Sequence, residues 1–182
     1  MDTNWLTDTI KTAIGKKRVL QAAARFAGEE LPVTRLLELT FAPEKEQAFR
    51  AAWILEHLAT DMPDAFQPGA EAFLDRYPEQ RNLICQRHYC RIMMEIAGKK
   101  NGLRYKTVLE KRNLDPVIDA TFEWLIQPGS PVAVQVNCLD ILYLLRHRAD
   151  WVTGELRLHI PFLLQGGSAA MQSRGKKVLA KL

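Results

Sequence analysis

The chain has 182 residues, of which 47% are hydrophobic and 25% charged, and it carries a formal net charge of +4 at pH 7. This composition is ordinary for a globular domain, and no stretch approaches the roughly eighteen apolar residues that a membrane span requires. The three cysteines do not suggest a disulfide framework, and the first residues lack the apolar core of a signal peptide. We therefore expect a single domain over residues 1–182, located in the cytoplasm.

Apolar residues spaced by three or four positions predict helices along most of the chain. In the segment 44–60, for example, Ala48, Ala52 and Leu55 fall on one stripe, and their small size favours close packing of helices. Signals for β-strands are few. The predicted helices span residues 4–14, 16–27, 33–40, 44–60, 64–76, 79–97, 115–126, 130–147, 151–164 and 168–181.

A helical string of nine or ten residues recurs four times. It reads RAAWILEHLA from Arg50, YCRIMMEIAG from Tyr89, NCLDILYLLR from Asn137 and RGKKVLAKL from Arg174, at spacings of 39, 48 and 37 residues. Spacings near 40 are typical of the two-helix repeats of HEAT and armadillo proteins. The sequence therefore predicts an all-α fold, a short right-handed HEAT/armadillo-like α–α solenoid of about four helix pairs. An irregular helical bundle is the alternative.

The longest of these spacings indicates an insertion, which we place between Gly98 and Asn113. Its sequence, GKKNGLRYKTVLEKRN, is rich in glycine, asparagine and lysine. Such a composition is typical of loops, so we expect a loop that holds at most one short helix.

Several strings also resemble a set of small bacterial HEAT-like α-solenoid proteins, of the kind encoded in Bacteroidetes-type genomes. The resemblance covers most of residues 49–182 and is carried by RAAWILEHL, FEWLI, VNCLDILYLL, DWVTGELRLHI and SAAMQSRGKKVLAKL. Such proteins are sometimes labelled adenylosuccinate lyases. True lyases are far longer, and their serine-rich mobile loop has no counterpart here. The resemblance therefore implies a fold and no catalytic residue.

The second helix of each pair usually lines the concave surface of such a solenoid, where partners bind. Opposite the apolar stripe of residues 44–60 lie Arg50, Trp53 and His57. Tryptophan and arginine dominate the energetics of many interfaces, which makes this side a candidate binding surface. The repeat alignment adds Tyr89, Asn137, Asp140, Arg174 and Lys177.

A purely structural interpretation of the same residues stays open. Asp140 and Lys177 can form a ladder between neighbouring helices, and Trp53 can pack under a neighbour. Two further tryptophans, Trp124 and Trp151, lie in apolar surroundings in the sequence, and we expect both to fill the core.

The string CQRHYC places Cys85, His88 and Cys90 close together and invites comparison with a metal site. On a helix, however, Cys90 lies about 140° from Cys85, so the three side chains cannot converge on one ion. The sequence supplies no second cysteine or histidine cluster for tetrahedral zinc. We expect two buried thiols, a surface imidazole, and neither a metal nor a cofactor.

Catalytic signatures are weak. The sequence contains no GxSxG, HExxH or glycine-rich phosphate loop. Glu56 and Glu95 occupy equivalent repeat positions, but shared packing explains this as well as paired acid–base chemistry does. We therefore favour a non-catalytic module that binds a protein or peptide on its concave face. A third interpretation, an enzyme of purine metabolism, rests on the lyase label alone.

The runner-up function is nucleic-acid binding, or a helical-repeat protein that acts on DNA bases. Four cations, Arg174, Lys176, Lys177 and Lys181, lie close together near the end of the sequence, with no acidic residue after Glu155 to balance them. Such basic clusters neutralise phosphates, and aromatic side chains stack on bases. This interpretation would use Arg50, Trp53, Asp140, Arg174 and Lys177.

Overall fold

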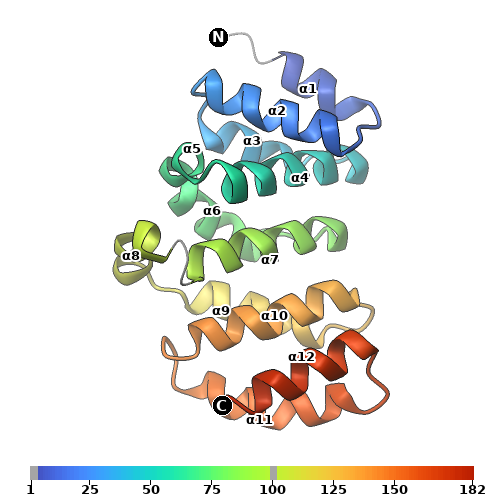
Figure 1. Ribbon diagram of the computed structural model, residues 1–182, viewed down its shortest axis with the longest axis vertical. Helices are drawn as coiled ribbons and strands as arrows, with labels where there is room; N and C mark the ends of the chain where they lie inside the picture. Colours follow the sequence, from blue (N-terminus) through green and yellow to red (C-terminus); the bar gives the residue numbers. More distant parts are fainter. Residues whose placement is uncertain (1–3, 99–101) are drawn as a thin grey trace. The chain divides into compact units, whose positions relative to one another are not determined.

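The computed structural model of the protein describes residues 4–98 and 102–182, and these residues form helices and turns without a β-strand. They divide into two compact units, residues 1–95 and 96–182, which are described separately below (Figure 1). The prediction of an all-α fold is confirmed. A single domain over residues 1–182 stays a prediction.

The first unit is built around one long helix. This helix, α4, contacts α1, α2 and α3, which precede it in the chain. Ala48, Ala51 and Ala52 are almost completely buried on α4, and because they lack bulk they let its neighbours approach closely. The predicted apolar stripe is therefore confirmed. The helices are α1 (Asn4–Lys11), α2 (Lys16–Gly28), α3 (Val33–Leu39), α4 (Lys45–Asp61), α5 (Pro63–Phe66), α6 (Ala70–Arg76) and α7 (Leu83–Ala97).

Two predicted helices of this unit differ from the observed ones. The continuous helix expected over residues 64–76 is wrong, because a 3₁₀ turn at Gln67–Gly69 separates α5 from α6. Pro68 lacks the N–H that an uninterrupted helix would use there. Helix α7 begins later than residue 79, since Oδ1 of Asn82 accepts a hydrogen bond from the N–H of Ile84 at 3.1 Å and so caps the helix.

The second unit contains antiparallel helix pairs. Helix α9 packs against α10, α11 packs against α12, and α10 also contacts α12, so the two second helices are neighbours (Figure 1). Trp124 and Leu142 are among its fully buried side chains. The helices are α8 (Gly102–Lys111), α9 (Asp115–Ile126), α10 (Val132–Leu145), α11 (Trp151–Leu164) and α12 (Ala169–Leu179).

The predicted insertion contains one short helix, which the expectation of a loop with at most one short helix allowed. Helix α8 occupies ten residues of it, while residues 99–101 lie outside the described residues. Tyr105 is fully buried, and the guanidinium of Arg148 donates a hydrogen bond to the carbonyl oxygen of Leu109 at 2.7 Å. A buried aromatic side chain and a bond to a late helical carbonyl stabilise α8 more than its composition suggests.

Candidate functional site

Arg50, the first predicted site residue, is engaged inside the first unit. Its Nη1 donates a hydrogen bond to the carbonyl oxygen of Ile10 at 2.9 Å, and its Nη2 lies 3.3 Å from Oε2 of Glu46. Ile10 belongs to the last turn of α1, where carbonyls have no partner within the helix. Only 14% of the Arg50 side chain is exposed, so its main role is to cap the C-terminus of α1, and little of it is available to a partner.

Trp53 belongs to an aromatic stack that joins α4 to α7. The Trp53 ring lies 5.8 Å from the ring of Phe49 and 6.5 Å from the imidazole of His88, between ring centroids. Phe49 in turn lies 5.3 Å from His88. Trp53 is half-buried, so it packs against a neighbouring helix and still offers part of its ring to solvent.

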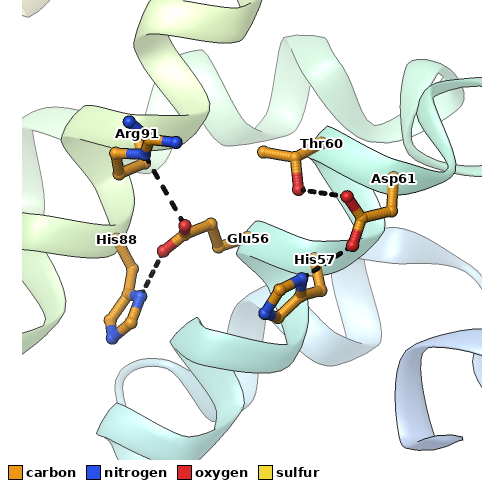
Figure 2. Close-up of polar contacts among 6 residues, drawn as sticks. All are labelled: Glu56, His57, Thr60, Asp61, His88 and Arg91. Carbon is orange, nitrogen blue, oxygen red and sulfur yellow. Dashed lines mark hydrogen bonds and ion pairs between the residues drawn. The ribbon is translucent and has the colours of Figure 1, made fainter. Parts of the chain in front are cut away.

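A carboxylate bridge lies beside this stack. Oε2 of Glu56 on α4 is 2.5 Å from Nδ1 of His88 on α7, and Oε1 of Glu56 is 3.7 Å from Nε of Arg91 (Figure 2). His88 is buried, which corrects the expectation of a surface imidazole. Its Nε2 is buried as well and has no hydrogen-bond partner among the described residues.

His57 forms a second histidine–carboxylate pair on the same helix. Its Nδ1 lies 2.7 Å from Oδ2 of Asp61, and the hydroxyl of Thr60 donates a hydrogen bond to Oδ1 at 3.3 Å (Figure 2). A histidine and an aspartate four positions apart on a helix are adjacent on its surface. This pair is therefore local to α4.

Tyr89, another predicted site residue, lies in the core and not on a surface. Its side chain is fully buried, and its hydroxyl forms a 2.6 Å hydrogen bond with that of Thr40. Its ring lies 5.0 Å from Phe73 and 6.1 Å from Tyr77. Burial raises the pKa of the Tyr89 hydroxyl. Tyr89 therefore stabilises the first unit and offers nothing to a partner.

The cysteines do not form a metal site with His88. Cys85 and Cys90 are both buried, as expected, and burial raises the pKa of the Cys85 thiol to about 12. Among the described residues, no group of three or more histidine, cysteine, aspartate and glutamate side chains is placed to hold a metal ion. A thiol with so high a pKa is protonated at neutral pH and is a poor ligand or nucleophile.

In the second unit, the structure brings together two of the predicted site residues. Oδ2 of Asp140 on α10 lies 3.4 Å from Nε of Arg174 on α12. Asn137, one turn earlier on α10, is half-buried, and Lys177, one turn later on α12, is exposed. The four residues that the repeat alignment assigned to this unit therefore lie on its two second helices, and one pair is in contact.

Three further residues of this surface were not among the predicted site residues. The guanidinium of Arg146 lies 3.9 Å from the ring centroid of Tyr143, and Nζ of Lys181 lies 5.9 Å from the same centroid. Tyr143 follows Asp140 by three positions, and Lys181 follows Lys177 by four. Extending the two helical stripes by one turn would have found both.

Asp140 is unusual in its electrostatics. Burial raises the pKa of its carboxyl above the ordinary value of 3.8, while Arg174, Lys177 and Lys181 act in the opposite direction. Desolvation is the larger effect, so burial destabilises the ionised form of Asp140 more than the three nearby cations stabilise it.

Of the two tryptophans expected in the core, one is there and one is not. Trp124 is buried, but Trp151 is 42% exposed and touches Phe122 edge-on, with 5.8 Å between ring centroids. Leu158 and Phe162, on the same helix as Trp151, are exposed too. This apolar face belongs to α11, the first helix of its pair, and not to the second-helix surfaces.

Two of the histidines are engaged by carboxylates. The histidines described above are paired with carboxylates through Nδ1, and the Nε2 of His88 is not accessible to a substrate. General acid–base catalysis requires such a group within hydrogen-bond reach of a reacting molecule.

Comparison with known proteins supports the fold prediction. No helix in residues 4–98 or 102–182 combines the length and apolar character needed to cross a bilayer. No curated protein and no solved structure matches the chain. A family model described as a HEAT repeat domain matches residues 6–182, in agreement with the recurring helical string and with the paired helices of each unit. Because this match spans nearly the whole sequence, the chain belongs to the HEAT repeat domain family.

Proposed function

We propose that the protein is a non-catalytic module that binds a protein or peptide segment on the exposed sides of its second helices. HEAT repeats generally serve as interaction modules, because stacked helix pairs present extended surfaces built from ordinary side chains. We place this activity in the cytoplasm, in keeping with the composition of the chain.

One observation carries the proposal: within each unit, two second helices are joined by side chains that are fixed by their neighbours and still partly exposed. Trp53 on α4 is held against His88 on α7, and Asp140 on α10 is held beside Arg174 on α12. Side chains that are already ordered lose little conformational entropy when a partner binds. Aromatic and arginine side chains held in this way are typical of binding hot spots.

The proposal is tested by affinity capture from the native cell lysate after nuclease treatment, followed by titration of the purified partner. Lys177→Glu and Trp53→Ala should each weaken binding at least tenfold. The matched control is Lys176→Glu, which makes the same charge change at the neighbouring exposed position of α12. Circular dichroism verifies that each variant is folded.

Arg50→Glu is unsuitable as a test because Arg50 caps α1, and its loss would disturb the fold. Capture that disappears with nuclease would contradict protein binding and favour a nucleic-acid partner. Binding that survives both substitutions on the second helices would contradict the proposed surface.

A further inference from the structure

Positive charge gathers on one face of the second unit, where α10 and α12 lie side by side. Residues 96–182 contain 13 lysines and arginines against 7 acidic residues. Four of these cations and two other side chains form what we name the cationic surface. Its members are Asp140, Tyr143, Arg146, Arg174, Lys177 and Lys181.

The spacing of the cations on α12 explains why they share a face. Arg174 and Lys177 are three positions apart on α12, so at about 100° per residue they lie about 60° apart around its axis. Lys181 follows the end of α12 by two residues, and its Nζ lies 5.9 Å from the ring centroid of Tyr143. All three act electrostatically on Asp140, and Nε of Arg174 lies 3.4 Å from its Oδ2. Lys176 lies about 200° from Arg174 around the helix axis and points away from this stripe.

The surface has more positive charge than its own carboxylate can neutralise. Asp140 is 17% exposed, and within the described chain no other carboxylate lies at ion-pair distance from these four cations. Arg174 is 39% exposed and meets Asp140 only through an ion pair, since its side chain makes no hydrogen bond within residues 4–98 and 102–182. Its guanidinium can therefore still donate two parallel hydrogen bonds to the carboxylate of a partner.

Tyr143 orders the surface but is badly placed to stack on a nucleobase. Arg146 lies 3.9 Å from its ring centroid and donates a hydrogen bond to the Tyr143 carbonyl oxygen, while Lys181 lies 5.9 Å from the ring. Because a guanidinium covers one face of the Tyr143 ring, little of the ring is available for a base to stack on.

The size of the surface fits a short extended peptide. From Arg174 to Leu179, where α12 ends, the helix rises about 8 Å, and Lys181 follows two residues later, so the stripe is about 10 Å long. An extended chain advances about 3.3 Å per residue, so a segment of three to four residues spans this distance. Its side chains can meet successive cations along the stripe.

We propose that the cationic surface binds an acidic segment of a partner protein, with glutamate or aspartate carboxylates contacting Arg174, Lys177 and Lys181. This inference rests on the proposed function and names the chemistry of the partner. Binding of the segment neutralises charge that Asp140 alone leaves unbalanced.

The test is fluorescence anisotropy of a labelled octaglutamate peptide titrated with the full chain at low salt. Wild type should bind, Lys177→Glu should weaken binding at least tenfold, and Lys176→Glu should change it less than twofold. Asp140→Asn should tighten binding severalfold because it removes the competing carboxylate. An unlabelled oligothymidylate of equal charge is the competitor.

Absence of binding, or equal loss with Lys176→Glu and Lys177→Glu, would overturn the inference. Stronger binding of oligothymidylate than of octaglutamate through Lys177 would overturn it in favour of nucleic acid. If the captured partner depends on Trp53 while octaglutamate does not bind, this inference fails and the proposed function stands. If octaglutamate binds but no protein is captured, the proposed function fails instead.

Discussion

The imidazole of His88 and the carboxylate of Glu56 join α7 to α4 through a contact of 2.5 Å between Nδ1 and Oε2. The carboxylate of Glu56 can only accept a hydrogen bond, so Nδ1 of His88 carries the proton and donates it. The buried Nε2 of His88 is left without a hydrogen-bond partner among the described residues. A buried hydrogen bond to a charged group contributes more to stability than one between neutral groups. The pair therefore fixes the α4–α7 contact on which Trp53 stacks.

The first prediction concerns Glu56. Glu56→Ala leaves the buried Nδ1–H of His88 without an acceptor and should lower the free energy of unfolding by about 1–3 kcal/mol. Urea denaturation followed by circular dichroism measures this change. The control is Glu38→Ala on α3, because Glu38 forms only an exposed ion pair with Arg35 and its loss should have a much smaller effect. Equal effects of the two substitutions would show that the buried pair contributes nothing special.

The second prediction concerns Glu30, which follows the C-terminus of α2 with a φ of +49°. The N–H of Glu30 bonds to the carbonyl of Ala27 and that of Leu31 to the carbonyl of Phe26, the two hydrogen bonds of a Schellman motif. Glycine is favoured at this left-handed position because it has no Cβ. Glu30→Gly should therefore raise the free energy of unfolding by about 1 kcal/mol. A lower melting temperature for this variant would contradict the assignment.

The third prediction compares two glycines. A Cβ added at Gly69 would lie 2.3 Å from Cβ of Val33, whereas one added at Gly154, inside α11, would meet nothing within 4 Å. Gly69→Ala should destabilise the protein, because α3 and the turn at Gly69 would have to separate. Gly154→Ala should stabilise it by about 1 kcal/mol through helix propensity. Thermal denaturation of both variants checks the opposite signs.

Helix positions were largely predictable from the sequence, because most of the helices repeat their apolar residues with a period near 3.6. The candidate site was predictable only in part. Asp140 and Arg174 were placed on neighbouring second helices because the repeat alignment carries them there, and the structure brings them to 3.4 Å. The same alignment failed for Tyr89, since α7 is buried around most of its circumference and α4 is not. The buried hydroxyl of Tyr89 is hydrogen-bonded to the hydroxyl of Thr40, which lies 49 positions away in the sequence. No local sequence pattern predicts such a distant partner.

The fourth prediction concerns the thiols. Cys85, Cys90 and Cys138 are all buried, and the pKa of Cys85 is raised to about 12. Native protein at pH 8 should therefore react only slowly with the thiol reagent DTNB, and all three thiols should react at once in 8 M urea. The slow native rate measures how often the surrounding helices open. Immediate reaction of one thiol in native protein would show that its burial is not maintained.

The last prediction concerns the pH dependence of stability near Asp140. Because burial raises its pKa above 3.8, the folded state binds a proton more tightly than the unfolded state. The contribution of Asp140 to stability should therefore fall as the pH rises from about 3.8 through the raised pKa, and then stay constant. Asn at this position mimics the protonated side chain.

Asp140→Asn should accordingly match wild type below pH 3.8 and become the more stable protein as the pH rises. Urea unfolding at steps from pH 3.5 to pH 7 measures the difference between the two curves, and Asp119→Asn on α9 controls for the loss of one negative charge from the same unit. Arg174→Gln should extend the window to higher pH, because removing the nearest cation raises the pKa of Asp140 further. A difference that shrinks with rising pH would mean that attraction to the cations outweighs desolvation, and that Asp140 stabilises the surface as an ordinary ion pair.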